Sequence, residues 1–273
     1  MLCQNSKTIL LPLLAMKEGQ KLWTREELIL AINLYCKIPF GKMHHRNPLI
    51  IEFANLIGRT PSSVTFKLGN LASFDPSLKE RGIKGASNAS KLDKEIWDEF
   101  YQNWDTTLIQ SETLLATKSH STIEKINHIE LTDLPKDGLE KERLVKTRVN
   151  QSIFRNIVLA TYNSRCCITG IENTELLIAS HIVPWSKDDK NRLNPMNGLC
   201  LNSLHDKAFD CGLIAISPDD YSLKISPALK SKTISPAIES NFIAFENKSI
   251  ILPDKFLPSK EFLDYHYQHI FRK

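Results

Sequence analysis

The segment 176–212 constrains the fold most, because it places two short apolar runs on either side of a polar loop. The first run, ELLIASHIVPW, is typical of a strand and ends at Pro184, which cannot continue a ladder of hydrogen bonds. The polar loop SKDDKNRLNPMN, a second apolar run GLCLNSL and the helix-like HDKAFDCG follow, with Gly212 as a stop signal. The order predicts a compact strand, loop, strand and helix.

His181, Asn197 and His205 lie at three points of this unit, and each alone is ordinary in a strand end, a turn or a helix start. Together they suit phosphodiester hydrolysis. A neutral imidazole can accept the proton of an attacking water near pH 7, and a divalent cation can stabilise the charge that develops on the phosphate. His181 is the candidate base, His205 the candidate metal ligand, and Asn197 the residue that braces the loop.

The motif SHIVPW…NPMNGLCLNSLHDKAFD resembles the HNH nucleases, which have the ββα-metal fold, and is similar to their bacterial restriction- and defence-type branch. The resemblance runs from about Arg148 to the C-terminus. It implies the same three catalytic residues, with His205 as a metal ligand. Many members carry Asp or His before the base, where this chain has Ser180, a weak ligand for Mg²⁺. The expected metal set is therefore His205, Ser180 and Asp210, with Asp206 as an alternative carboxylate.

The expected cofactor is a divalent metal, Mg²⁺ or Mn²⁺. Structural zinc is not expected, because the sequence has no CxxC pair. No glycine-rich phosphate loop or dinucleotide fingerprint occurs, so no nucleotide cofactor is expected. The cysteines form no disulfide framework and indicate reduced thiols in a cytoplasmic protein; there are six, Cys3, Cys36, Cys166, Cys167, Cys200 and Cys211.

Residues 23–104 have helical periodicity. Thr24 and Glu27 form a capping-box pattern, and Gly58 separates two apolar stripes, the second of which starts at Thr60-Pro61. Two short helices with a tight turn predict a helix-turn-helix-like domain, in which Arg59 and Lys67 are candidate DNA contacts. The alternatives are a helical bundle with solvated charges, and a domain that senses a small ligand or a protein.

The chain is predicted to be an α+β protein of 273 residues with an extension over 1–22, a helical recognition domain over 23–104, a linker over 105–140 and a nuclease domain over 141–273. A helix from about Glu140 carries Arg148, Gln151 and Arg155 on one face, which would bind phosphate or be a solvated face. The sequence after Gly212 predicts a hairpin, a third strand over about 242–253, and a final helix.

Hydrophobic residues make up 42% of the chain and the net charge is +4, which is compatible with DNA as a partner but does not indicate it. No apolar run reaches the roughly 18 residues of a membrane helix, so no membrane association is expected. Double-strand cutting by a nuclease with one site makes a homodimer plausible. The leading hypothesis is a DNA endonuclease. The alternative is a DNA-binding regulator or sensor with a catalytically weak HNH scaffold, which Ser180 favours.

Overall fold

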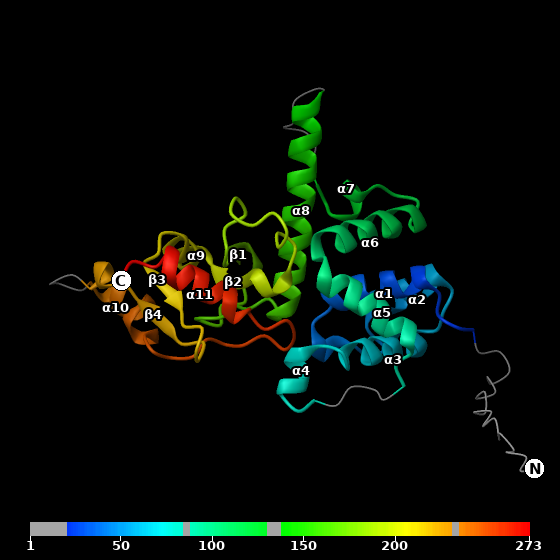
Figure 1. The fold of residues 1–273 in the computed structure, drawn as a ribbon, viewed down its shortest axis with the longest axis horizontal. Coiled ribbons are helices and arrows are strands. Elements are labelled where there is room, and N and C mark those ends of the chain that lie inside the picture. The colour runs from blue at the N-terminus through cyan, green and yellow to red at the C-terminus, as the bar shows by residue number, and fades with distance from the viewer. Residues whose placement is uncertain (1–20, 84–87, 130–137, 231–234) are drawn as a thin grey trace, which may run out of the picture.

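The structure, a computed structural model, describes residues 21–83, 88–129, 138–230 and 235–273. A helical half formed by the first part of the chain lies beside a second half that carries two small sheets, and one long helix stands between them (Figure 1). Helices and antiparallel strands occur together, as expected for an α+β protein. Nearly all of the predicted extension, 1–22, lies outside the described residues.

The helical half is built around α1 (Arg25–Lys37), which packs against the other long helices of this half. Most of the α1 side chains are buried, and Glu27 closes the predicted capping box with Thr24: each backbone N–H donates to the other residue's side chain, at 2.8 and 3.3 Å. The other helices are α2 (Pro48–Ile57), α3 (Pro61–Ala72), α4 (Pro76–Glu80), α5 (Lys91–Gln102), α6 (Trp104–Lys118) and α7 (Ile123–Ile126).

The turn between α2 and α3 has the chemistry expected from the sequence. Gly58 has φ +66°, a conformation that glycine adopts without strain. Thr60 then accepts a hydrogen bond from the Ser63 amide, and Pro61 occupies the first position of α3. The helix boundaries predicted here are confirmed.

The segment 105–140 differs from the expected linker, because α6 and α7 fill much of it and pack into the helical half. The Ser/Thr content suggested a loop, but the hydroxyls of Thr107, Thr113 and Thr117 donate to carbonyls four residues earlier at 2.6–2.9 Å. Hydroxyls satisfied on their own helix do not compete with it. Trp104 and Leu108 bury the inner face.

α8 (Leu139–Thr161) stands between the halves, and its first turns project beyond the body of the molecule (Figure 1). Its C-terminal part contacts α1 on one side and both strands of the first sheet on the other. Val149, Ile153 and Ile157 are buried at intervals of four, as the periodicity predicted. Among the described residues, no helix is both long and apolar enough to cross a bilayer.

The first sheet pairs β1 (Leu177–His181) with β2 (Gly198–Asn202) in antiparallel register, so that His181 lies opposite Gly198. α9 (Ser203–Asp210) follows β2 and packs back on both strands. The predicted order of strand, loop, strand and helix is confirmed. Gly198 is required for close approach to α8, because a Cβ there would lie 2.5 Å from a methyl carbon of Val158.

The chain continues into a second hairpin, β3 (Ile214–Ile216) with β4 (Leu223–Ile225), and then α10 (Pro236–Asn241) and α11 (Lys260–His269). The third strand predicted over 242–253 is wrong. Residues 243–245 form a 3₁₀ turn, and Asn247 has φ +60°, which breaks an extended run. The segment meets the second sheet through a single isolated bridge of Ser249 to Ser222 and backbone hydrogen bonds of its neighbours to Tyr221 and Leu223, and it forms no strand of its own.

Residues 251–258, the C-terminal strap, cross back to the helical half. The buried Lys255 ammonium donates to carbonyls at the end of α1, those of Cys36 at 3.2 Å, Ile38 at 2.9 Å and Tyr35. Phe256 packs edge-on against Tyr35 and Trp104, with ring centroids 5.8 and 5.4 Å away. The strap therefore completes the core of the helical half.

We expect Lys255→Met to lower the free energy of unfolding by about 2–4 kcal/mol, because buried carbonyls at a helix end would lose their donor. Denaturant unfolding followed by circular dichroism measures the change. Lys91→Met is the matched control, since the Lys91 side chain is 93% exposed. Equal midpoints for Lys255→Met and the unmodified protein would contradict the capping role.

Candidate active site

His181 ends β1 with its ring stacked on Phe154 of α8 at a centroid distance of 3.7 Å, and Trp185 meets it edge-on at 5.4 Å. Its Nε2 lies 2.9 Å from the carbonyl oxygen of Arg192. A carbonyl can only accept, so Nε2 carries the proton and Nδ1 holds the lone pair. Nδ1 has no hydrogen-bond partner among the residues the structure describes. The ring is thus fixed with one nitrogen available as a proton acceptor.

The surroundings of His181 favour the neutral ring. Burial lowers the pKa of His181 below its ordinary value, and the hydrogen bond to the Arg192 carbonyl opposes part of that shift. The side chain remains partly exposed. A neutral, oriented and accessible imidazole is what a general base requires.

Asn197 is buried and joins both ends of the loop that follows β1. Its Oδ1 accepts from the Val183 amide at 2.8 Å, and its Nδ2 donates to the carbonyls of Val183 and Asn191 at 3.3 and 3.1 Å. Its own carbonyl accepts from the Ile182 amide at 2.9 Å. These contacts fix the backbone on both sides of the loop and, with it, the end of the strand that carries His181.

His205 is placed differently from the ligand expected at this position. The ring is 0% exposed, with Nε2 2.7 Å from the Asn241 carbonyl and Nδ1 3.0 Å from the Asn202 amide nitrogen. Phe242 covers it edge-on at 5.2 Å. Both ring nitrogens are therefore engaged by the protein, and the packing of α9 against 241–245, which the sequence does not reveal, leaves neither of them for a cation.

Cys166 is the other neighbour of this ring, with its Sγ 4.0 Å from Nδ1 of His205. Burial alone would raise the pKa of the Cys166 thiol, but its contacts with His205 and Thr169 outweigh burial and lower the pKa to about 7. The described cysteines form no disulfide. Cys166 and His205 thus form a buried polar pair behind the first sheet and α9.

Asp206 and Asp210 lie one turn apart on α9, and Asp206 is beside Ser180 of β1. Burial raises the pKa of Asp206, while the neighbouring Ser180 hydroxyl lowers it in part. Burial and the charge of Asp206 together raise the pKa of Asp210. Among the described residues, the buried Ser180 Oγ makes no hydrogen bond of normal geometry. Two neighbouring carboxylates beside a buried hydroxyl fit a hard cation.

No group of three His, Cys, Asp or Glu side chains suited to a metal occurs within the described ranges. Two carboxylates and a hydroxyl would give a metal ion only a few protein ligands. Such a set suits Mg²⁺ or Mn²⁺, which retain bound water, more than zinc, which prefers four protein ligands in structural sites.

The three α8 residues expected to bind phosphate are used unequally. The Arg155 guanidinium donates to the carbonyls of Leu177 and Thr174 at 2.6 and 2.8 Å, and so anchors the start of β1. Gln151 is exposed, whereas Arg148 is half-buried and has partners within the protein. Gln151 is thus the most accessible of the three.

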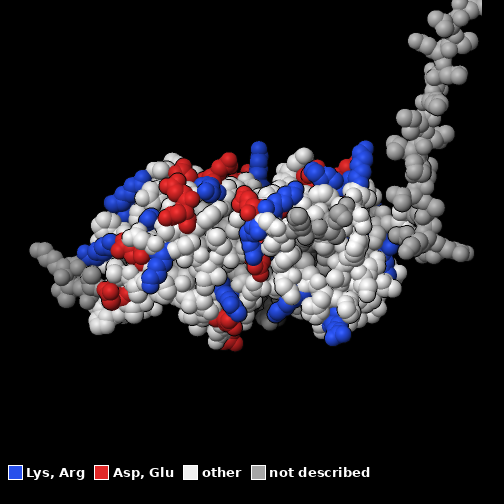
Figure 2. All heavy atoms as spheres, turned by 90° about the horizontal axis from the view of Figure 1, so that it is seen from below, with Lys and Arg blue, Asp and Glu red and all other residues white. Residues whose placement is uncertain are grey.

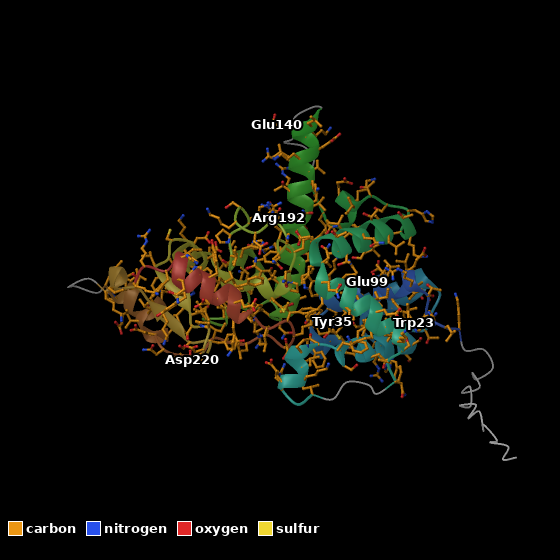
Figure 3. All side chains as sticks on the ribbon, in the orientation of Figure 1. Trp23, Tyr35, Glu99, Glu140, Arg192 and Asp220 are labelled. Atoms are coloured by element: carbon orange, nitrogen blue, oxygen red, sulfur yellow. The ribbon has the colours of Figure 1, made fainter. Side chains whose placement is uncertain are left out.

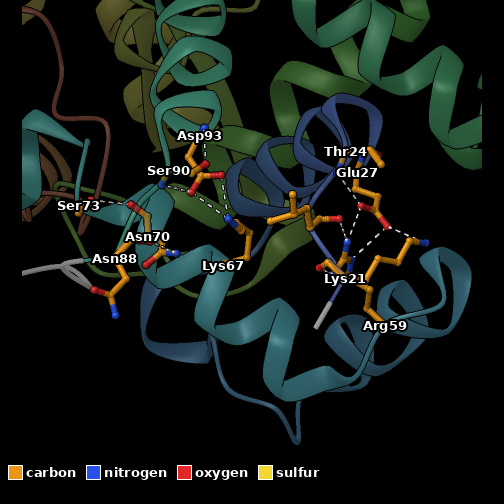
Figure 4. Close-up of polar contacts among 11 residues, drawn as sticks. Lys21, Thr24, Glu27, Arg59, Lys67, Asn70, Ser73, Asn88, Ser90 and Asp93 are labelled. Carbon is orange, nitrogen blue, oxygen red and sulfur yellow. Dashed lines mark hydrogen bonds and ion pairs between the residues drawn. The ribbon is translucent and has the colours of Figure 1, made fainter. Parts of the chain in front are cut away.

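Arg59 and Lys67, the other expected DNA contacts, lie along one cavity of about 1040 Å³ in the helical half, and both are ion-paired (Figure 4). Arg59 binds Glu27 at 2.7 Å and Lys67 binds Asp93 at 2.8 Å. The Lys67–Asp93 pair is buried. Each of the two cations therefore already has a carboxylate partner.

Four residues that help to form the site were not predicted: Phe154, Trp185, Arg192 and Asp105. Phe154 is one of several apolar residues on α8, and nothing in the sequence distinguishes it. Arg192 contributes through its backbone carbonyl, which composition cannot reveal. Asp105 binds the Leu193 amide at 2.8 Å from a segment expected to be a linker. Trp185 lies close to His181 in the sequence, just after Pro184. This short separation was the one sequence signal that could have placed it at the site.

The chain was compared with known proteins. Residues 166–217 match the family model HNH_2, described as HNH endonuclease. No curated protein matches the chain. The matched segment contains His181, Asn197, His205 and both aspartates of α9, and it coincides with the first sheet, α9 and β3.

Proposed function

We propose, with an HNH endonuclease domain over 166–217 as the premise, that the chain hydrolyses phosphodiester bonds of DNA with His181 as general base. One observation carries the proposal: the ring is held by the Arg192 carbonyl through Nε2 and by Phe154 through its face, so that Nδ1 remains as the proton acceptor. Nδ1 takes the proton from the attacking water, and the Arg192 carbonyl stabilises the imidazolium that forms.

Asp206 and Asp210 are proposed as the carboxylates that hold a divalent cation, with Ser180 as a neighbouring hydroxyl. The unsatisfied Ser180 Oγ and the raised pKa of both carboxyl groups support this choice. When bound, the cation supplies charge stabilisation at the phosphate. His205 is proposed to support α9 from behind, through Asn202 and Asn241, which replaces the ligand role expected from the sequence.

DNA is proposed to lie along α8 and the loop 184–197, where exposed basic side chains flank the site. Lys187, Lys190 and Lys207 are exposed near His181 and α9, and Gln151 is exposed on α8. By contrast, lysine and arginine alternate with acidic residues on the face drawn in Figure 2, which offers a polyanion no broad basic surface there. A restriction- or defence-type role, with target choice by the helical half, belongs to this proposal.

The decisive experiment incubates the full chain with unmodified, methylated and hydroxymethylated DNA and a panel of divalent ions. We expect nicking or cutting with Mg²⁺ or Mn²⁺, and a loss of at least 100-fold in Asp206→Asn/Asp210→Asn, because the cation would lose its charged ligands. Asp264→Asn, at an exposed position of α11, is the matched control. If the double variant cleaved at the rate of the control, the assignment of the α9 carboxylates would fail.

A second function is favoured by the cavity beside Arg59 and Lys67. Its lining includes Trp23 and the buried Asn70, whose side-chain oxygen has no hydrogen-bond partner within the part of the chain that the structure describes. In this alternative, the helical half binds a ligand or DNA as a sensor or regulator, and the HNH unit is a catalytically weak scaffold. Salt-dependent DNA binding that survives both a chelator and His181→Ala, without any cleavage, would support it over the nuclease.

A further inference from the structure

The loop 184–197 is held internally by polar side chains three residues apart. Asp188 accepts from the Asn191 side chain at 2.7 Å, and the Asn191 side chain accepts from that of Asn194 at 2.9 Å. Asn197 donates to the Asn191 carbonyl. This series fixes most of the loop, but the peptide group between Arg192 and Leu193 takes its partners from elsewhere.

One of those partners comes from the helical half. Asp105, in the first turn of α6, is half-buried and accepts from the Leu193 amide at 2.8 Å. The sequence separation is 88 residues, so this contact joins the two halves of the molecule. Figure 3 shows Arg192 beside α8, between the helical half and the sheets.

The other partner is the candidate base. The carbonyl that accepts from His181 Nε2 at 2.9 Å belongs to Arg192, and the amide that donates to Asp105 belongs to Leu193. These are the two ends of one planar peptide group, which point in opposite directions when the bond is trans. The contacts form one continuous series: carboxylate, peptide, imidazole. Hydrogen bonds in such a series polarise one another.

We infer that Asp105 is a positioning residue for His181, acting through the Arg192–Leu193 peptide. This inference deepens the proposed nuclease function and rests on it. The carboxylate accepts the hydrogen bond of the Leu193 N–H and thereby polarises the peptide group. This polarisation increases the partial negative charge on the Arg192 carbonyl oxygen. That oxygen then holds the proton on Nε2 of His181 more firmly and keeps the lone pair on Nδ1. An aspartate bound directly to a catalytic histidine fixes its tautomer in the same way; here a peptide group is interposed.

The charged groups around this series belong mainly to the loop itself. Arg192 and Asp188 are the charged side chains that act on Asp105. The Arg192 guanidinium donates through Nε to the Trp185 carbonyl at 3.2 Å and lies 5.1 Å from the Trp185 ring centre. Arg192 therefore also fixes the indole that meets His181 edge-on.

The kinetic test compares Asp105→Asn with the unmodified protein. Asparagine keeps an oxygen that accepts from Leu193, so the fold is retained while the charge is lost. We expect kcat for DNA cleavage to fall about 10-fold with KM unchanged, because the base is less well oriented while DNA contacts are untouched. Asp105→Glu, which keeps the charge, should recover part of the loss. Asp98→Asn, at the surface ion pair with Lys94, is the matched control and should change neither constant.

A second readout does not depend on cleavage. Nitrogen-15 NMR of the His181 ring at one fixed pH above neutrality reports which nitrogen carries the proton. We expect the Nε2–H form in the unmodified protein and a larger share of the Nδ1–H form in Asp105→Asn.

Identical ring spectra, or a rise in KM that accounts for the whole kinetic effect, would overturn the inference. If the spectra change but the unmodified protein cuts no DNA, the series stands and the proposed function fails. If the protein cuts DNA and Asp105→Asn changes neither kcat nor the spectrum, only the inference fails.

Discussion

Replacing His181 with alanine is expected to slow DNA cleavage by about 10²- to 10⁴-fold, the usual contribution of a general base. Nδ1 of this ring is the proton acceptor, and alanine offers no group that could replace it. The Arg192 carbonyl, which orients the ring, would lose its partner. DNA affinity should be unchanged, because the imidazole acts on water. Single-turnover cleavage with saturating enzyme and metal measures the effect separately from binding.

His269→Ala is the matched control, since His269 is exposed on α11. Added imidazole should restore part of the rate to His181→Ala by occupying the space beside Phe154. A cleavage rate in His181→Ala equal to that of the control, on every DNA tested, would remove the general base from the mechanism.

Replacing His205 with alanine is expected to lower the free energy of unfolding by about 3 kcal/mol, through a cavity and the loss of one hydrogen bond from each of two polar groups. Those groups are the Asn202 side-chain amide and the Asn241 carbonyl, and both lie against a ring with no exposure to solvent. Denaturant unfolding in a chelator and in Mg²⁺ measures the loss under both conditions.

The metal dependence of that loss separates two roles for His205. A packing histidine gives the same loss with and without Mg²⁺, because the metal binds elsewhere. A ligand gives a larger loss in Mg²⁺, since the variant can no longer gain stability from binding the ion. His266→Ala is a useful comparison, because His266 is likewise buried and stacks on Phe209 at 3.6 Å.

Local signals in the sequence predicted the secondary structure around the motif well. β1 ends shortly before Pro184, β2 begins at Gly198, and α9 ends shortly before Gly212. The segment 105–118 could not be recognised as a helix, because its threonines satisfy their hydroxyls on carbonyls of their own turns. The third strand failed because Asn247 adopts a left-handed conformation.

The sequence predicted the candidate site only at positions where the residue type by itself indicates a role. A histidine at the end of β1 and an asparagine in the loop have the positions expected of them. The surroundings of His205 depend on Asn241, 36 residues away, and the contact of Asp105 spans 88 residues. Periodicity and spacing contain no information about such distant contacts, so the surroundings of His205 and of Asp105 could not be predicted from the sequence.

The strap also determines when the core of the helical half can form. Phe256 and Lys255 complete a core that begins with Tyr35 and the end of α1, so this core needs a residue 220 positions further along the chain than Tyr35. A nascent chain stalled before the strap would expose Tyr35 and Trp104. The helical half therefore reaches its final packing only together with the segment that follows the two sheets.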